Sequence, residues 1–227
     1  MKIILTNDDG IDAPGLACLV QIVKEIGTPV VVAPEAAQSG VGHRVTTHSP
    51  IYVKDLSKNR YGVRGTPADC VRLGLKEFAP DAEWLIAGIN PGANLGSDVY
   101  QSGTVAAARE AAILGCRAIA ISQYIARDRQ IDWNTTGGHS ERVLKILLGK
   151  ELLTGHYWNV NLPYTLENNS RPNTVFCRLD KNPHRYGYRH RGDEYIYKGV
   201  IHERPRDPGK DVAVCFGGEI SVTQLKL

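Results

Sequence analysis

The chain lacks the features that mark membrane, secreted or disulfide-rich proteins. Its five cysteines are odd in number and widely separated, and no C-x-x-C pair suggests a zinc or redox site. No stretch approaches the roughly 20 consecutive apolar residues of a membrane span. No long apolar segment follows Met1 as it would in a signal peptide. We therefore expect a cytoplasmic protein with reduced cysteines and no membrane partner.

Several catalytic motifs are also missing. The phosphate loop G-x-x-x-x-G-K-[ST] is absent, and the first strand is not followed by G-x-G-x-x-G, which disfavours P-loop NTPases and ordinary dinucleotide-binding enzymes. No G-x-S-x-G elbow occurs, so a serine hydrolase of that type is disfavoured. The seven histidines show no H-E-x-x-H or similar zinc spacing.

A strong charge of one sign is absent too, since the formal net charge is only +3. The positive charge is concentrated between Lys181 and Lys210, where eight Lys/Arg face four Asp/Glu. This segment also holds aromatic residues, a combination that can bind nucleic acid through phosphates and stacked bases. Its members are Arg185, Tyr186, Tyr188, Arg189, His190 and Arg191. Because the overall charge is small, a solvated β-arm or a subunit interface is favoured over nucleic-acid binding for this segment. An intermediate hypothesis is that its aromatic residues contact the base of a substrate.

The apolar residues that are present predict alternating strands and helices. A short buried strand at residues 3–5 is followed by apolar residues at helical spacing from Leu16 to Ile26 and by a β-rich run at 29–33. Such a β-α-β unit builds a parallel sheet with a right-handed crossover. Further strands are expected at 51–53, 84–87, 118–122 and 158–162, and further helices from Thr66, at 104–114 and at 141–153.

The alternation predicts two parts of unequal size. Residues 1–163 are expected to form an α/β core with a Rossmann-like, doubly wound and mostly parallel sheet. Residues 164–227 form a β-rich extension that returns to the core, with strands at 174–179 and 220–225 and no helical period between 182 and 208. The Gly/Pro/Asn-rich segment 88–96 is expected to be an irregular loop.

Two adjacent carboxylates follow the first strand, in the sequence Asn7-Asp8-Asp9-Gly10. Ligands of open α/β sheets collect at the carboxyl ends of the strands. Two ionised side chains so close together repel each other unless a cation, a proton or strong donors hold them. A bound divalent metal is the simplest solution, although Asp and Gly also favour plain turns.

Two other polar loops follow predicted strands and should lie at the same edge of the sheet. They are Gln38-Ser39-Gly40 and Gly92–Gly96, which contains Asn94. The loops offer carboxylate, hydroxyl and amide oxygens, and His43 is the only histidine nearby. Such hard oxygen ligands suit Mg²⁺ or Mn²⁺ better than zinc.

The turn Ser102-Gly103-Thr104 opens an Ala-rich helix. A helix N-terminus with free N–H groups and hydroxyls beside it is an anion site, although these hydroxyls could also act only as helix caps. A cation beside an anion-binding helix start is the arrangement that phosphoryl transfer needs. The residues therefore predict hydrolysis of a phosphate ester.

The segment Leu5–Gly15, with the sequence LTNDDGIDAPG, resembles the opening signature of the SurE family of metal-dependent nucleotidases. The resemblance covers most of residues 1–163. It continues at Ala33-Pro34, Gln38-Ser39-Gly40, Gly65–Val71, Gly88-Ile89-Asn90, Asn94, Gly96, Asp98, Ser102–Val105 and Asn159–Pro163. The closing segment matches less well, because Gln224 stands where the family usually has proline.

The resemblance implies a 5'/3'-nucleotidase that hydrolyses nucleoside 5'- or 3'-monophosphates and in some cases short polyphosphate. It implies one divalent cation, Mn²⁺ or Mg²⁺, with Asp8, Asp9, Ser39 and Asn94 as ligands. It places Asn90 and the turn Ser102-Gly103-Thr104 in the phosphate pocket, and we add Gly40 and His43 to this substrate-binding set. It also implies a hairpin and a C-terminal arm exchanged in a homodimer or homotetramer.

Several roles stay open at this level. Asp8 and Asp9 are the expected catalytic residues, and metal-activated water is favoured over direct attack by one of the carboxylates. His43 could protonate the leaving group or only cover the pocket. A metal-dependent deacetylase, which also has an Asp-Asp pair after its first strand, is the alternative enzyme, but Thr6 and the absence of paired histidines disfavour it. A non-catalytic nucleotide-binding module is the third possibility.

Overall fold

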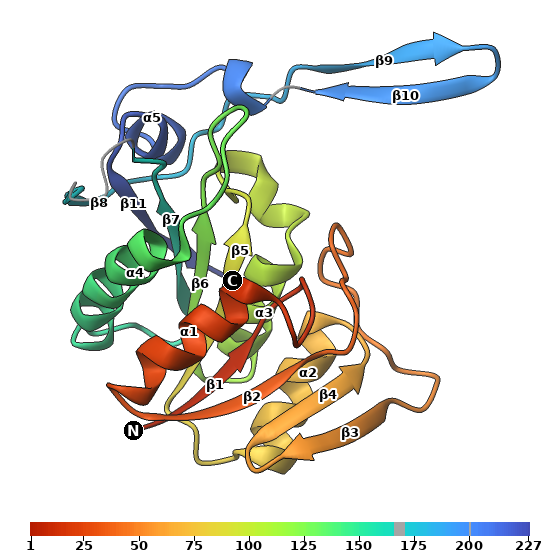
Figure 1. The fold of residues 1–227 in the computed structure, drawn as a ribbon, viewed down its shortest axis with the longest axis vertical. Helices are drawn as coiled ribbons and strands as arrows, with labels where there is room; N and C mark the ends of the chain where they lie inside the picture. The colour runs from red at the N-terminus through yellow and green to blue at the C-terminus, as the bar shows by residue number, and fades with distance from the viewer. Residues whose placement is uncertain (166–170, 200) are drawn as a thin grey trace.

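A computed structural model describes residues 1–165, 171–199 and 201–227. Residues 166–170 and 200, which belong to the predicted extension, lie outside this description. The chain forms one nine-stranded sheet with helices on both faces and a separate two-stranded hairpin (Figure 1). The expected α/β fold with a mostly parallel sheet and a β-rich extension is confirmed.

The large sheet has the strand order β3-β4-β2-β1-β5-β6-β7-β11-β8. The strands β4, β2, β1, β5, β6 and β7 run parallel, while β3 is antiparallel to β4 and β11 is antiparallel to β7. Their bounds are Lys2–Thr6 (β1), Thr28–Pro34 (β2), Tyr52–Ser57 (β3), Arg60–Arg64 (β4), Trp84–Pro91 (β5), Arg117–Gln123 (β6), His156–Leu162 (β7), Thr174–Phe176 (β8) and Ile220–Lys226 (β11).

The order of the strands reverses between β1 and β5. The chain first builds from β1 toward β2 on one side and later continues from β5 toward β7 on the other. In doubly wound sheets the crevice at such a reversal, outside the carboxyl ends of the strands, is where ligands bind. The segments after β1 and β5 are therefore placed to form a site.

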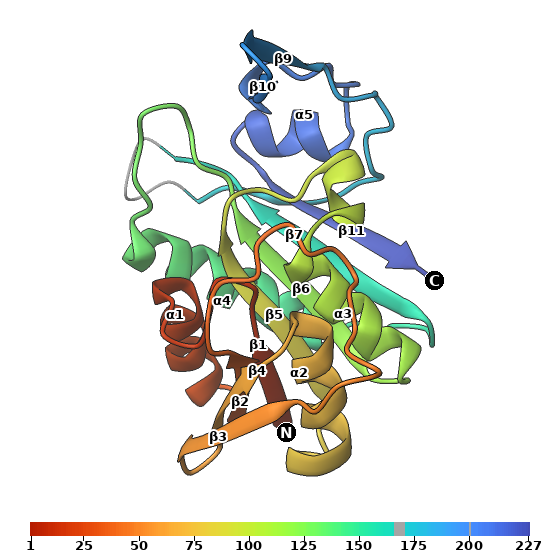
Figure 2. The ribbon, with the colours of Figure 1, turned by 90° about the vertical axis from the view of Figure 1, so that its right-hand side faces the viewer.

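Helices cover both faces of the sheet (Figure 2). The helices α1 (Pro14–Lys24) and α4 (Trp133–Leu148) pack on one face, where Ile3, Leu5 and Leu16 share a core. The helices α2 (Pro67–Leu73) and α3 (Gly103–Ile113) pack on the other face. Alternate residues of β1 enter these two cores because neighbouring side chains of a strand point to opposite faces.

Local signals explain where two helices begin. Thr66 caps α2 as predicted: its hydroxyl accepts the Asp69 N–H, while the Asp69 carboxylate accepts the Thr66 N–H, which forms a capping box. Ser102 caps α3, and its hydroxyl accepts the Val105 N–H at 3.0 Å. A π-helical turn, Gly74–Phe78, prolongs α2.

Some predicted bounds are wrong. The segment 88–96 is not irregular throughout, because β5 continues to Pro91 and Asn90 pairs with Ser122 of β6, while a 3-10 helix, η2, spans Gly96–Tyr100. The helix predicted at 141–153 is α4, which begins earlier because Asp132 caps it and ends at Leu148. The strand predicted at 174–179 ends at Phe176.

The C-terminal part combines a projecting hairpin with a return to the sheet. The strands β9 (Tyr186–Arg191) and β10 (Glu194–Gly199) form the hairpin and are followed by a short 3-10 turn, η3 (Ile201–Glu203). The helix α5 (Asp211–Phe216), which the sequence analysis did not predict, precedes β11. In Figure 1 the hairpin extends away from the sheet. Within the described residues, no helix is long and apolar enough to cross a membrane.

Candidate functional site

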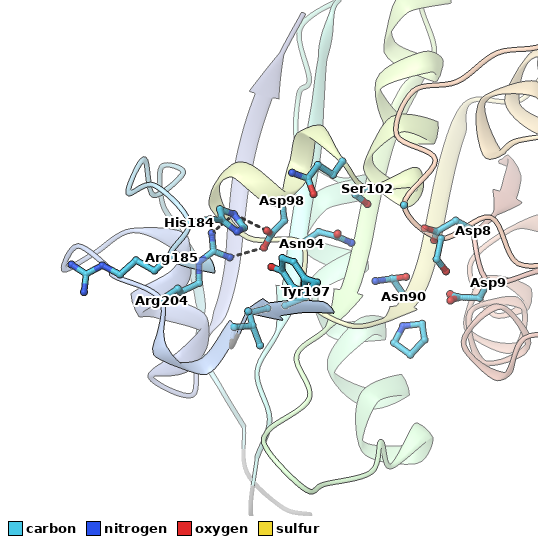
Figure 3. Close-up of a pocket in the computed structure, with 17 residues that line it drawn as sticks. Asp8, Asp9, Asn90, Asn94, Asp98, Ser102, His184, Arg185, Tyr197 and Arg204 are labelled. Carbon is cyan, nitrogen blue, oxygen red and sulfur yellow. Dashed lines mark hydrogen bonds and ion pairs between the residues drawn. The ribbon is translucent and has the colours of Figure 1, made fainter. Parts of the chain in front are cut away.

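A pocket of about 500 Å³ opens at the reversal of the strand order (Figure 3). One wall of the pocket is formed by residues at or after the carboxyl ends of β1, β2 and β5 and by the residues just before α3. The other part is formed by η2 and by the C-terminal extension. The lining residues are Asp8, Asp9, Ser39, Gly40, Asn90, Pro91, Ala93, Asn94, Asp98, Gln101, Ser102, His184, Arg185, Tyr197, Gly199, Ile201 and Arg204.

Asp8 is buried at the N-terminus of α3. Its carboxylate accepts a hydrogen bond from the Thr104 hydroxyl and also contacts the backbone N–H groups of Gly103 and Thr104. A Cβ on Gly103 would lie 2.9 Å from the Asp8 Cβ, so only glycine allows the helix start to approach so closely. Burial raises the pKa of Asp8, while these hydrogen bonds oppose the rise by favouring the ionised form.

Asp9 has no comparable donors. Its Oδ2 is buried and has no hydrogen-bond partner among the described residues. Burial, and secondly the neighbouring charge of Asp8, raise the pKa of Asp9 to about 7. A carboxylate in this situation needs a proton or a cation, because burial without a partner disfavours its ionised form.

Asn94 lines the pocket and is held in place by hydrogen bonds to residues of two neighbouring strands, β6 and β7. Its backbone N–H donates to Asn161 at 2.7 Å, and its carbonyl accepts from Asn159 and Asn161. Its side-chain Nδ2 donates to Ser122 at 2.9 Å. Because the amide nitrogen is engaged in this way, the side-chain oxygen is the end of Asn94 that is left to serve as a ligand.

The loop after β2 brings Ser39 and Gly40 to the pocket. The Gln38 N–H donates to the Asp8 carbonyl at 2.7 Å, and the Gly42 N–H donates to the Gln101 carbonyl at 3.2 Å. These two bonds attach the loop to both sides of the site. Asn90, at the end of β5, completes this group and donates from Nδ2 to the Gly92 carbonyl.

The turn that opens α3 lies differently from the prediction. Ser102 lines the pocket, but Gly103 and Thr104 do not, because both contact Asp8 instead. The anion that these two residues hold in the structure is the Asp8 carboxylate. Gly103 and Thr104 would therefore influence phosphate binding indirectly, because they fix the position of Asp8.

His43 also lies outside the lining of the pocket. Its Nε2 pairs with the buried carboxylate of Glu110 at 2.7 Å, and Arg109 Nε donates to its Nδ1 at 3.0 Å. Since Nδ1 accepts, the proton of a neutral ring is on Nε2 and is donated to Glu110. Both nitrogens are engaged, so the structure does not direct His43 toward a leaving group.

The sequence indicated the basic, aromatic segment of the C-terminal extension only as a possible contact for the base of a substrate, and the charged group that forms this wall of the pocket was not predicted. Arg204 donates to Asp98 at 2.6 Å and contacts His184, whose Nε2 lies 3.0 Å from the other Asp98 oxygen. Figure 3 shows this group on the side of the pocket away from Asp8 and Asp9. The resemblance to the family marked Asp98, but no local pattern pairs it with a residue 106 positions later.

The donor set fits a hard divalent cation. The described residues contain no group of three or more His, Cys, Asp or Glu side chains that could hold a metal. A zinc site of the usual composition is therefore not found in this part of the chain. Two carboxylates, one with an unpartnered oxygen, together with hydroxyl and amide oxygens match the preferences of Mg²⁺ or Mn²⁺.

Comparisons with known proteins agree on one family. The model of the Survival protein SurE family matches residues 3–185. A putative 5'-nucleotidase of Synechocystis is 47% identical over 227 residues and covers both chains fully. The 5'-nucleotidase SurE of Paramagnetospirillum magneticum is 40% identical, over 99% of this chain and 89% of its own. The crystal structure of the SurE protein from Aquifex aeolicus has a TM-score of 0.89 and 31% identity, over 100% of this chain and 93% of that chain.

Proposed function

The chain belongs to the SurE family, and on that basis we propose that it is a divalent-metal-dependent 5'-nucleotidase, a phosphoric monoester hydrolase acting on nucleoside 5'-monophosphates. The family and its relatives give no support to a deacetylase. A catalytic role is favoured over a non-catalytic binding module because Asp8 and Asp9 are crowded together at the binding crevice, where burial raises the pKa of both carboxyl groups. Such an arrangement costs stability and is typical of a catalytic centre.

One observation carries the proposal: Asp9, which has a buried oxygen without a partner among the described residues, lines a pocket that Ser39 and the fixed amide of Asn94 also line. Asp8, Asp9, Ser39 and Asn94 would hold the cation. When bound, a divalent cation supplies positive charge that neutralises phosphate oxygens and makes water a better nucleophile.

The protein's own residues position the reaction. Asn90 and Ser102 line the pocket between the carboxylates and the C-terminal wall and would bind the phosphate oxygens. Water attacks phosphorus, the ester P–O bond breaks, and the leaving alkoxide takes a proton. Asp9, which lines the pocket, would accept the proton of the attacking water, and the leaving alkoxide would take a proton from solvent.

Attack by water is favoured over attack by a carboxylate. Asp8 is held by the Thr104 hydroxyl and the start of α3, so it is not free to move toward phosphorus. Hydrolysis of a nucleotide with a chiral phosphate tests this step. Inversion is expected from a single in-line displacement, and net retention would show a phosphorylated enzyme instead.

The proposal extends to finer points of substrate and assembly. Nucleoside 3'-monophosphates and short polyphosphate offer the same terminal phosphoryl group, and we include both as substrates, with Mn²⁺ or Mg²⁺ as the ion. We further propose that residues 1–163 act as the catalytic core and 164–227 as an extension that forms a homodimer or homotetramer. Light scattering of the purified protein measures that assembly.

A substrate and metal panel tests the activity. Phosphate release is measured from nucleoside 5'- and 3'-monophosphates and from tripolyphosphate, with Mn²⁺, with Mg²⁺ and with EDTA. We expect release from the 5'-monophosphates that EDTA abolishes and added Mn²⁺ restores. Tight nucleotide binding without any phosphate release would show a binding module, and release that resists EDTA would refute metal dependence.

A further inference from the structure

The pocket is larger than a phosphate group alone requires, and a second recess lies beside it. This recess has a volume of about 450 Å³ and is lined by Gln101, His184, Tyr186, Tyr188 and Tyr197. Gln101, His184 and Tyr197 also line the first pocket, so the two cavities adjoin. The carboxylate end and the tyrosine end are thus neighbouring cavities that share three lining residues.

The tyrosines come from one face of the β9–β10 hairpin. Tyr197 lies directly opposite Tyr188 in the antiparallel pairing, and Tyr186 lies opposite Gly199. Residues that face each other across a strand pair share a face. The ring of Tyr197 lies 5.7 Å from Tyr186 and 6.1 Å from Tyr188, measured between centroids. More than half of the surface of each of these three residues is exposed.

The ring of Tyr197 packs against Gly199. A Cβ on Gly199 would come within 2.2 Å of the Tyr197 hydroxyl, so the ring lies over the backbone of a residue without a side chain. Gly199 itself lines the pocket. In the view of Figure 3, Tyr197 lies between the Asp98–Arg204 pair and the Asp8–Asp9 pair.

We propose that Tyr197, supported by Tyr186 and Tyr188, stacks with the base of a nucleoside monophosphate whose phosphate lies at Asp8 and Asp9. This inference rests on the proposed nucleotidase function and adds a specificity-determining residue to it. Aromatic side chains stack with any nucleobase, because every base has a π-face. A tyrosine subsite therefore strengthens binding of nucleotides over simple phosphate esters.

The basic side chains near the tyrosines do not form a second binding site for the base. Arg204 and His184 both contact Asp98, and this carboxylate offsets the positive charge of Arg204. Figure 3 shows the Arg185 side chain extending away from the carboxylates. The tyrosine rings are the groups at this end of the pocket that are free to contact a ligand with an extended π-surface.

The test compares a nucleotide with the same phosphate ester lacking a base. Values of kcat/KM are measured for adenosine 5'-monophosphate and for ribose 5-phosphate, with Mn²⁺. Tyr197→Ala is expected to lower the ratio of the two values about tenfold, mainly through KM for the nucleotide. Tyr197→Phe keeps the ring and should keep the ratio. Tyr195→Ala removes a ring from the same strand and the same face but lines neither cavity, and it serves as the matched control.

Each outcome decides between clear alternatives. An unchanged ratio in Tyr197→Ala would overturn the base subsite. Equal losses in Tyr197→Ala and Tyr195→Ala, together with a lower mass in light scattering, would also overturn it and show that the aromatic face contacts a second copy of the chain. No hydrolysis of either ester by the unsubstituted protein would instead refute the proposed function.

Discussion

Asp8 and Asp9 are neighbours in the chain, but different surroundings hold them. Asp8 accepts hydrogen bonds from Thr104 and from the first N–H groups of α3. Asp9 has a buried oxygen without a partner among the described residues. The hydrogen bonds at α3 therefore offset part of the cost of burying the Asp8 carboxylate, whereas the buried oxygen of Asp9 is held at a cost that a bound cation would remove.

Substitution by asparagine should separate these two roles. Asp8→Asn weakens the charged hydrogen bonds at α3 and is expected to lower the free energy of unfolding by about 1–2 kcal/mol. Asp9→Asn removes the repulsion and should leave the stability of the metal-free protein unchanged or raised. Both changes should lower turnover on the order of a hundredfold. Urea unfolding and phosphate release measure the two effects, and full turnover of both variants at saturating Mn²⁺ would contradict the assignment.

The pKa of Asp9 also predicts a pH dependence. The folded state raises this pKa from 3.8 to about 7, so between these values the folded protein holds a proton that the unfolded chain releases. Stability of the metal-free protein should therefore fall as pH rises from about 4 to about 7. The affinity for Mn²⁺ should rise over the same range, because the cation competes with the proton.

Thermal unfolding in EDTA at several pH values, for the unsubstituted protein and for Asp9→Asn, isolates this contribution. Other carboxylates titrate in both proteins, so the difference between the two curves reports on Asp9. We expect that difference to change steadily up to about pH 7 and then to level off. A difference that is independent of pH would show that Asp9 is ionised throughout.

At the scale of single elements, α3 supports two sides of the site. Its first turn holds Asp8, and Glu110 in its third turn holds the loop after β2 through His43. Arg72 of α2 donates to the other Glu110 oxygen at 2.5 Å. Glu110 is almost fully buried, so its charge depends on these partners.

Glu110→Ala should therefore reduce both stability and metal binding. Removal of the carboxylate leaves Arg72 and His43 without their shared partner, and we expect a loss of about 2 kcal/mol in the free energy of unfolding. The loop that carries Ser39 should also become more mobile and the Mn²⁺ affinity should decrease. Glu141→Ala, which removes an exposed ion pair with Lys145, is the control and should change stability by less than about 0.5 kcal/mol. Equal effects of the two substitutions would contradict this role of Glu110.

The elements that could be predicted from the sequence are those with local signals. The capping box at Thr66 and the Ser102 cap depend on residues three positions apart, and the strands of the core are short apolar runs. The start of α4 was missed because Trp133–Ser140 contains Thr and two glycines and has little helical propensity, although Asp132 caps it. In that segment tertiary contacts outweigh propensity, since Thr136, His139 and Ser140 are buried.

At the scale of the whole molecule, the sequence predicted how the carboxylate end of the pocket assembles, whereas for the opposite wall it indicated a possible contact to a base and no pairing between residues. Asp8, Ser39 and Asn94 follow strands of one sheet and Asn90 lies near the end of β5, so their meeting follows from the topology of parallel strands. The pairing of Asp98 with Arg204 joins residues 106 positions apart. No spacing rule covers such contacts, which depend on how the extension packs against the finished sheet.

Asp211 shows how that packing reaches the site. This fully buried carboxylate accepts the N–H groups of Gly96, Asp180 and Val212 at 2.7, 2.6 and 3.0 Å. It thus joins the start of η2, two residues after Asn94, to the C-terminal extension. The extension should therefore influence the metal site without supplying a ligand to it.

Asp211→Asn tests this coupling. Asparagine has one acceptor oxygen, so its NH₂ group would face an N–H donor, and we expect the free energy of unfolding to fall by about 2 kcal/mol. Because the segment from Asn94 to Gly96 loses an anchor, the affinity for Mn²⁺ should fall as well.

Asp81→Asn, at an exposed ion pair with Lys2, should leave both quantities within error of the unsubstituted protein. Calorimetric titration with Mn²⁺ beside urea unfolding measures them. A destabilised Asp211→Asn protein with unchanged metal affinity would mean that the extension contributes to the fold alone, and that Asn94 is held by Asn159, Asn161 and Ser122 without it.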